Sequence, residues 1–369
     1  MSQAYTPGLT ITPYAVLRKT RKLPIKGEVL VKVGERVKPE SIVARAFLPG
    51  AAHIVKAGEL LGVAGEDLER HLLKRVGDKV EENEVVASAT SFFGLSKKFV
   101  RSPIKGTIEN ISPLTGNITI REEPKPLLLP AYVEGEVVEI LPEEGVVVET
   151  KGAFIQGIFG VGGERWGELR VAVTSPSEPI REMKEEYRGC IVVGGSIDGE
   201  RLREAVKVGV KGIVVGGIFD EVLRDFLGYD IGVAITGQED IALTIIITEG
   251  FGVLPVSQRA FSLLKRFEGF QVSINGTTQI RAGVVRPEII IPHKEELPSY
   301  ELQLIQPLGI GTRVRVIREP YFGLLGKVVG LPAEPKILET GARTRVAEVV
   351  LDTGEKVVVP RANLEIIID

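Results

Sequence analysis

The sequence predicts a β-rich protein of several domains, with an α/β domain at its centre. The chain has 369 residues, which exceeds the usual size of a single core. Hydrophobic residues make up 44% of the chain and aromatic residues only 6%, so valine, isoleucine and other small apolar residues dominate, as in sheet proteins. One apolar phrase ending in Asp occurs three times, at residues 191–198, 213–220 and 233–240. Strands alternating with helices at this repeat predict a central parallel or mixed sheet with about three helices.

Composition narrows the classes of function. The net charge of -3 creates no global field that would attract nucleic acid or an anionic membrane. Cys190 is the only cysteine, which excludes an intramolecular disulfide and favours a reducing compartment. No apolar run approaches the ~20 residues that span a bilayer, and residues 1–13 lack a signal-peptide pattern. We therefore expect a cytoplasmic protein, and its abundant Glu, Lys and Arg are typical of thermophiles.

The N-terminal third contains an internal repeat. Residues 33–46 align without a gap with residues 76–89. Each copy has a Val-Gly-acid-base-Val segment, typical of a tight turn between short strands, followed by an apolar strand. We expect the two copies to pack together as one small sandwich that occupies residues 1–123.

Val76-Gly-Asp-Lys-Val80 followed by Ser102-Pro-Ile-Lys-Gly-Thr107 resembles the barrel-sandwich hybrid family, which includes the lipoyl and biotinyl carrier domains. The resemblance covers roughly residues 20–123. It implies that a lysine in the hairpin between the two motifs, Lys97 or Lys98, is the candidate for carrying a prosthetic group. The sequence lacks the Asp-Lys-Ala or Met-Lys-Met tip of the carriers, so we favour a structural sandwich with solvated lysines and expect no cofactor.

Two short segments flank this region. Residues 18–22 form a dense basic cluster that could contact phosphates, although a solvated strand is the interpretation we favour. Residues 124–130 are rich in proline and predict an extended linker. The second domain, residues 131–292, then begins with a predicted β-hairpin.

The first two copies of the central phrase predict strands that end in a glycine pair. Asp198 and Asp220 stand where an N-cap carboxylate would accept bonds from the next helix. The pattern therefore predicts two helices, and residues 257–267 predict a third. In such sheets, ligands bind beyond the carboxyl ends of the strands. A capping carboxylate repels an anion, however, which disfavours a phosphate site after these two strands.

The third copy has no room for a following helix, so its polar groups are not explained by capping. Together with a polar run near residue 278, they form a candidate ligand site at the carboxyl edge of the sheet. The residues are Thr236, Gln238, Glu239, Asp240, Thr277, Thr278, Gln279 and Arg281. The alternative for the second group is a hairpin built on an Asn275-Gly276 turn.

No catalytic or metal-binding constellation is visible in the sequence. His53, His71 and His293 lie far apart and have no cysteine partners at zinc-ligand spacing. Nucleophile-elbow, Walker and kinase motifs are also missing. We therefore expect a protein without metal or catalytic residues.

Residues 311–330 alternate basic and apolar residues before Pro320, Gly323 and Gly326, and residues 348–359 add two strands around Asp352-Thr-Gly354. This segment resembles the KOW motif of transcription-elongation and ribosomal proteins, and it implies an SH3-like barrel over residues 308–369. By that resemblance the contacts to RNA or a partner would be Arg313, Arg315, Arg318, Tyr321 and Lys327. From residue 311 onward nine basic and eight acidic residues nearly cancel, so a protein partner or a structural barrel fits as well as RNA.

These observations favour a non-enzymatic binding or scaffold protein that acts in transcription or translation through the C-terminal barrel. Its partner would be a protein or ribonucleoprotein, with the ribosome and RNA polymerase as candidates. An enzyme or small-ligand-binding protein with a site at the central sheet is one alternative, and a carrier-domain protein is another. Association of several copies through strand edges is a further expectation.

Overall fold

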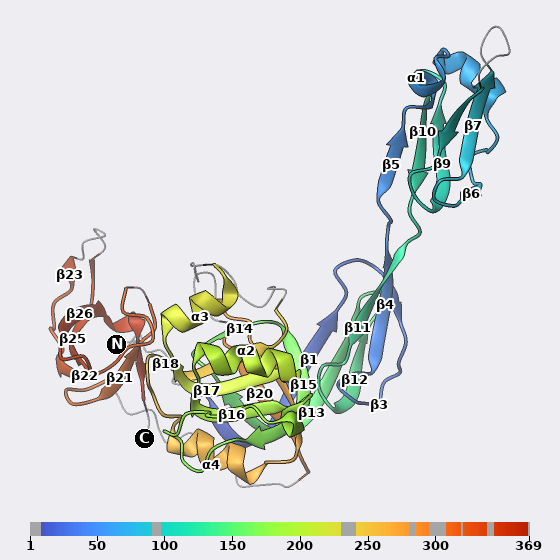
Figure 1. The fold of residues 1–369 in the computed structure, drawn as a ribbon. Coiled ribbons are helices and arrows are strands. Elements are labelled where there is room, and N and C mark those ends of the chain that lie inside the picture. The colour runs from blue at the N-terminus through green and yellow to red at the C-terminus, as the bar shows by residue number, and fades with distance from the viewer. Residues whose placement is uncertain are drawn as a thin grey trace.

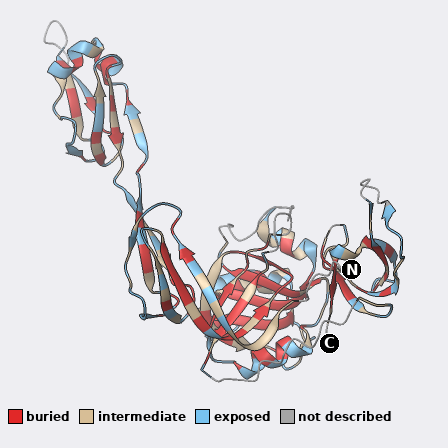
Figure 2. Cartoon of the chain, turned by 180° about the vertical axis from the view of Figure 1, so that it is seen from behind, coloured by how far each residue is buried: buried red, intermediate tan, exposed pale blue. Residues whose placement is uncertain are grey.

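The computed structural model describes residues 9–90, 97–229, 241–279, 285–294, 308–318, 320–337 and 343–367. The protein is elongated: a central body carries a C-terminal unit on one side and a long β arm with a distal unit on the other (Figure 1). Buried residues concentrate in the central body, and the distal unit has a separate core of its own (Figure 2). The β-rich, multidomain class predicted from the sequence is confirmed.

The central body is built on an eleven-stranded mixed sheet. Its strands β15, β16, β17 and β18 pair in parallel, and all other pairs are antiparallel. In spatial order, the strands on the main path are β14 (Phe159–Val161), β18 (Thr244–Phe251), β17 (Gly212–Ile218), β16 (Ile191–Ser196), β15 (Glu164–Val171), β19 (Gln271–Asn275), β20 (Glu288–Pro292), β13 (Gly145–Gln156), β12 (Gly135–Leu141) and β3 (Arg36–Val37), and β1 (Ile11–Lys22) also pairs with β13.

Among the described residues, three helices cover the parallel part of the sheet, as the sequence predicts. Helices α2 (Gly199–Val208) and α3 (Asp220–Leu227) lie on one face and α4 (Gln258–Arg266) on the other (Figure 1). The Asp198 carboxylate caps α2 by accepting a hydrogen bond from the Arg201 N–H at 2.8 Å. The prediction that Asp220 caps α3 is wrong, because Phe219 occupies the N-cap position and Asp220 is the first helical residue.

The basic cluster near the N-terminus lies in β1 and is matched by carboxylates. Ion pairs join it to β13 and to neighbouring segments: Arg18 to Glu149, Lys19 to Glu288, Arg21 to Glu164 and Lys22 to Glu144. Because each cation in the cluster has an acidic partner, the run fastens β1 to the sheet. A phosphate-binding role for this run is not supported.

The two copies of the N-terminal repeat build two equivalent units, one after the other along the arm. In the proximal copy the Gly34 N–H donates to the Val137 oxygen, and in the distal copy the Gly77 N–H donates to the Ile108 oxygen. Both glycines have φ near +90°, which favours glycine at this turn. The proximal strands are β2 (Glu28–Val29), β3, β4 (Ile42–Leu48), β11 (Lys125–Pro130), β12 and the first half of β13.

The distal unit occupies residues 52–121. It contains a four-stranded sheet, a two-stranded hairpin and two short helical segments. Its elements are β5 (Ala52–Val55), α1 (Ala57–Leu61), η1 (Gly65–His71), β6 (Lys79–Val80), β7 (Val85–Thr90), β8 (Lys97–Arg101), β9 (Gly106–Ser112) and β10 (Asn117–Arg121).

This arrangement differs from the single sandwich expected over residues 1–123. Strand β1 pairs with β13, and β4 pairs with β11, so strand pairs cross the expected boundary. The proline-rich segment predicted as a linker is strand β11, which tolerates its prolines because it lies at the edge of the β11-β4-β2 sheet. A neck of two adjacent chains, residues 49–51 and 122–124, then connects the two units (Figure 1).

The C-terminal unit is a five-stranded antiparallel sheet in the order β26-β25-β22-β21-β27. Only the three residues of η3 (Arg361–Asn363) join the two edge strands. That connection spans roughly 14 Å at most, whereas the edges of a flat five-stranded sheet lie roughly 19 Å apart. The sheet must therefore be curled. Its strands are β21 (Arg313–Val316), β22 (Leu325–Gly330), β25 (Val346–Leu351), β26 (Lys356–Pro360) and β27 (Leu364–Ile366), and a separate β23 (Lys336–Ile337) and β24 (Arg343–Thr344) form a small hairpin.

Two sets of contacts fix this unit to the central body. Phe322 packs against Phe159 and Phe251, with ring centroids 6.3 and 6.2 Å away. Buried Arg315 bonds to Glu249 of β18 at 2.6 Å and to Glu365 of β27 at 2.9 Å. The C-terminal sheet therefore has a defined orientation on the core.

Candidate functional site

The carboxyl edge of the parallel sheet, where ligands bind in many α/β proteins, is covered by the protein's own chain. A Cβ at Gly195 would lie 2.6 Å from the Pro176 oxygen, and one at Gly216 would lie 2.4 Å from the Leu254 oxygen. The glycine pairs thus allow the segments that follow β15 and β18 to cross directly over the ends of β16 and β17. Their role is close packing of backbone, which accounts for the repeated phrase.

Five of the eight residues of the predicted ligand site at this edge lie outside the described residues, namely Thr236, Gln238, Glu239, Asp240 and Arg281. The other three residues make hydrogen bonds with the backbone or through it. The Thr278 hydroxyl accepts from the Gly160 N–H at 2.9 Å, and the Thr277 N–H donates to the Asn275 side chain at 2.9 Å. The backbone of Gln279 pairs with that of Val285. These three residues therefore hold β14 and a turn in place.

The alternative prediction of a hairpin built on an Asn275-Gly276 turn is wrong. Strand β19 ends at Asn275, and its partner β20 begins only at Glu288. Gly276 is needed for another reason, because a Cβ there would lie 2.3 Å from the Val161 oxygen of β14.

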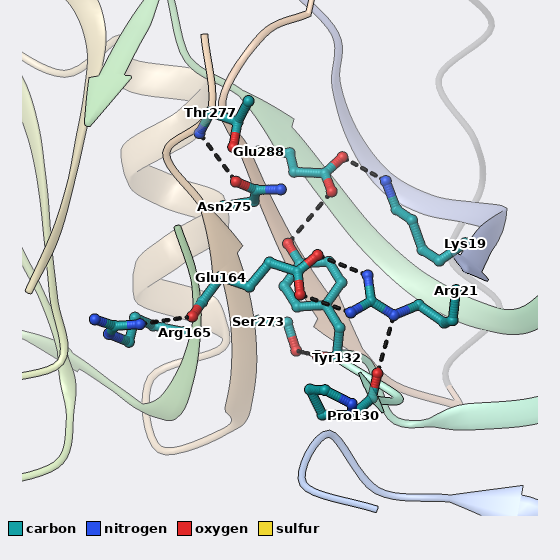
Figure 3. A network of polar contacts seen from close by, with 10 residues as sticks. All are labelled: Lys19, Arg21, Pro130, Tyr132, Glu164, Arg165, Ser273, Asn275, Thr277 and Glu288. Atoms are coloured by element: carbon teal, nitrogen blue, oxygen red, sulfur yellow. Dashed lines mark hydrogen bonds and ion pairs between the residues drawn. The ribbon is translucent and has the colours of Figure 1, made fainter. Parts of the chain in front are cut away.

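A partly buried polar network lies where the arm joins the central body (Figure 3). We call it the root network, and its members are Arg21, Pro130, Tyr132, Glu164, Ser273 and Glu288. Arg21 of β1 forms two parallel bonds to Glu164 of β15, at 2.6 and 2.7 Å, and its Nε donates to the Pro130 oxygen. Its guanidinium lies 5.3 Å from the centre of the Tyr132 ring. The Tyr132 hydroxyl donates to Glu288 at 3.3 Å.

Tyr132 has a backbone conformation that is rare for a residue with a side chain. Its φ is +71°, in the left-handed region, and the surrounding structure must hold it there. The Ser273 hydroxyl donates to the backbone carbonyl oxygen of Tyr132 at 2.6 Å, and the backbone N–H of Tyr132 donates to the Pro39 carbonyl oxygen. Burial, together with the nearby carboxylate of Glu288, raises the pKa of Tyr132 well above its usual range. The hydroxyl is therefore a neutral donor, and the root network connects β1, β15, β19 and β20 with the segment between β11 and β12.

The residues predicted to contact RNA or a partner separate into different environments. The Arg315 side chain is only 3% exposed and forms ion pairs with two carboxylates, those of Glu249 and Glu365. The prediction that Arg315 contacts RNA or a partner is therefore wrong. Tyr321 packs against the core of the C-terminal sheet. Arg318 borders a small gap between this sheet and the central body. Arg313 and Lys327 are the exposed members of the set.

Arg313 and Lys327 belong to a surface that we call the outer face. They lie opposite each other on β21 and β22, and the same cross-strand row continues through Val350 to Lys356. Val329 and Val358 add exposed apolar side chains to this surface. The signal for these valines and for Lys356 was present as alternation within the strands, but the pairing register was needed to bring them together.

Charge pairing on the outer face is uneven. Arg313 forms two bonds to Asp352, and Lys356 pairs with Glu348. Lys327 has no ion-pair partner among the described residues. In the described part of this unit, the outer face therefore places Lys327, a cation without an ion-pair partner, among exposed valines.

The candidate carrier lysines lie at the start of β8, directly after the segment that connects it to β7. The Lys97 ammonium lies over the Phe99 ring at 5.4 Å, and the Lys98 ammonium donates to the Leu61 oxygen at 3.4 Å. Both side chains are exposed. Their contacts are those of ordinary surface lysines.

Within the described ranges, no group of histidine, cysteine and acidic residues is arranged to hold a metal ion. None of the helices there has the length and apolarity that a membrane crossing requires. Comparison of the sequence with protein-family models and with curated proteins finds no match.

Proposed function

We propose that this protein is a non-enzymatic scaffold that binds a protein partner, a component of the transcription or translation machinery, through the outer face of its C-terminal sheet. The outer face carries the proposal, because it combines basic side chains with exposed valines at fixed positions. A face of this kind complements a partner surface with acidic and apolar side chains.

The strand order supports an SH3-like barrel of the KOW type as the unit that presents this face. A curled five-stranded sheet, a turn at Asp352–Gly354 and a short 3₁₀ segment before the last strand agree with that assignment. The Phe322 and Arg315 contacts fix the barrel on the central body, so the partner would meet a preorganised surface.

A protein partner fits the outer face better than single-stranded RNA. Binding of unpaired bases relies on exposed aromatic side chains for stacking. The two aromatic residues of this region that the structure describes, Tyr321 and Phe322, pack inward. Asp352 and Glu348 also lie among the cations and would repel phosphates.

The test is direct binding of the full chain to purified RNA polymerase, to ribosomes and to an RNA oligonucleotide. We expect one of the two assemblies to bind and Lys327→Glu to weaken that binding by at least about tenfold. Lys207→Glu, on the exposed side of α2, is the matched control and should leave binding unchanged. Failure of both assemblies to bind, or equal effects of the two substitutions, would overturn the proposal. Binding of the oligonucleotide alone would assign the face to RNA.

A further inference from the structure

A hollow of about 480 Å³ lies between α4 and the segment that follows β15. We call it the polar hollow. It sits beside the covered carboxyl edge of the parallel sheet and is separate from the outer face. Its lining residues are Thr174, Ser175, Pro176, Gln258, Phe261, Ser262, Lys265 and Arg266.

The lining has the chemistry of an anion site. It offers three hydroxyl groups and one amide as hydrogen-bond partners, and two cations from the last turn of α4. No carboxylate is present among these lining residues. Lys265 is exposed and has no ion-pair partner in the described parts of the chain. Its charge is therefore available to a ligand.

Both walls of the polar hollow are held in place before any ligand arrives. On one side, Glu178 accepts bonds from the N–H and the hydroxyl of Thr174, at 3.0 and 2.9 Å, and the Pro176 oxygen accepts from the Val256 N–H. On the other side, the Ser257 hydroxyl caps α4. The hydrogen bonds from Thr174 hold the pKa of the Glu178 carboxyl below its usual range. The Glu178 carboxylate is therefore ionised and already hydrogen-bonded to Thr174.

The second wall is linked to the C-terminal sheet. Glu249 accepts from the Ser257 N–H at 3.0 Å and from Arg315 at 2.6 Å. The start of α4 is therefore fixed by a carboxylate that the C-terminal unit also holds. Fixed walls reduce the ordering cost of binding.

Size and polarity together define the class of ligand. The volume lies within the range of small-molecule sites. Paired cations and hydroxyls suit a phosphate group, whose oxygens accept several charge-assisted hydrogen bonds. The remaining amide and hydroxyls suit the hydroxyl groups of a short polyol, while Phe261 and Pro176 supply apolar surface.

We propose that the polar hollow binds a phosphate monoester of a small polyol, with Lys265 and Arg266 contacting the phosphate and Ser262, Gln258 and Thr174 contacting the hydroxyl groups. This inference does not depend on the partner proposed for the outer face. If the polar hollow binds no such ligand, the proposal for the outer face is unaffected, and the reverse also holds.

The experiment is calorimetric titration of the full chain with glycerol 3-phosphate, with glycerol and with inorganic phosphate. We expect saturable binding of glycerol 3-phosphate, weaker binding of inorganic phosphate and none of glycerol. Lys265→Gln should weaken binding of the ester by about tenfold or more, since it removes a charge-assisted contact. Lys207→Gln is the matched control, because Lys207 is an exposed lysine in the last turn of α2.

Three results would overturn the proposal. The first is no saturable binding of the ester or of phosphate at millimolar concentration. The second is an equal loss for the Lys265 and Lys207 variants, which would show unspecific attraction. The third is equal affinity for the ester and for inorganic phosphate, which would remove the polyol from the assignment.

Discussion

Replacing Arg315 by Met separates a structural role for this residue from a contact role. Its side chain is 3% exposed, and its carboxylate partners Glu365 and Glu249 are 1% and 12% exposed. Removing one member of a buried ion pair costs about 3–5 kcal/mol, because the remaining charge stays buried without a partner. Glu365 keeps Arg286 at 3.3 Å and Glu249 keeps the Ser257 N–H, so we expect the lower end, about 3 kcal/mol.

The measurement is amide hydrogen exchange of peptides from β21 and β27, because a chain of several units has no single unfolding free energy. Arg315→Lys should lose less protection than Arg315→Met, since an ammonium keeps the charge but not the fork that reaches both carboxylates. Lys327→Met on the same sheet should change protection by less than about 0.5 kcal/mol. Unchanged protection in Arg315→Met, combined with lost partner binding, would refute the structural role.

Further predictions concern the root network, the glycine pairs and the cysteine. Tyr132→Phe removes the bond to Glu288 and should cost about 1 kcal/mol at pH 8. Burial raises the pKa of the Tyr132 hydroxyl in the folded protein above its unfolded value near 10. The contribution of this hydroxyl to stability is therefore complete below pH 10, and it is lost by about 1.4 kcal/mol per pH unit as the pH rises towards the folded pKa. The stability difference from Tyr132→Phe, measured in denaturant titrations by the fluorescence of Trp166 in β15 so that only unfolding of the central body is followed, should therefore shrink and reverse above about pH 10; a constant difference would contradict this. Gly216→Ala should destabilise the core by about 2 kcal/mol in the same assay, since its Cβ meets backbone. Gly199→Ala, at the start of α2, should be neutral or stabilising, since a Cβ there would make only ordinary van der Waals contacts with side chains. The pKa of the Cys190 thiol is raised by burial, so thiol labelling should be slow until denaturant opens the core; rapid labelling of the native protein would show that the site is open.

Local patterns predicted much of the central body. The apolar runs at residues 191–196 and 213–218 are buried on both faces, and such runs form interior strands of a parallel sheet. Helix α2 is capped by Asp198, as predicted, and α4 lies within the range predicted for the third helix, with Ser257 as its capping residue. In these elements, the local signal and the tertiary contacts agree.

The pairing of distant segments was not predictable from periodicity. Strand β1 pairs with β13, whose register partners lie more than a hundred residues away, and a single sequence contains no direct record of that choice. The edge position of β11, which makes its prolines acceptable, likewise depends on the tertiary arrangement. The repeat was visible, but whether its copies would pack together or stand in series was not.

The candidate sites show the same limit. Alternation identified Arg313 and Arg315 equally as basic strand residues, yet one is exposed and the other lies between two carboxylates from different units. The polar hollow combines residues near 175 with residues near 262, which no local motif connects. Burial and partner choice are properties of the fold, and they decide which charges remain available.

The series of two equivalent units has a topological consequence. In the distal unit β7 pairs with β8 as a hairpin, and in the proximal unit β4 pairs with β11 in the same register, with an irregularity at the same place. The whole distal unit therefore occupies the position of a hairpin loop in the proximal one. Excision of residues 51–122 would leave every other strand pair intact, whereas the proximal copy shares β12 and β13 with the central sheet. The distal unit is therefore an insertion in the proximal unit, whereas the proximal unit is continuous with the central sheet.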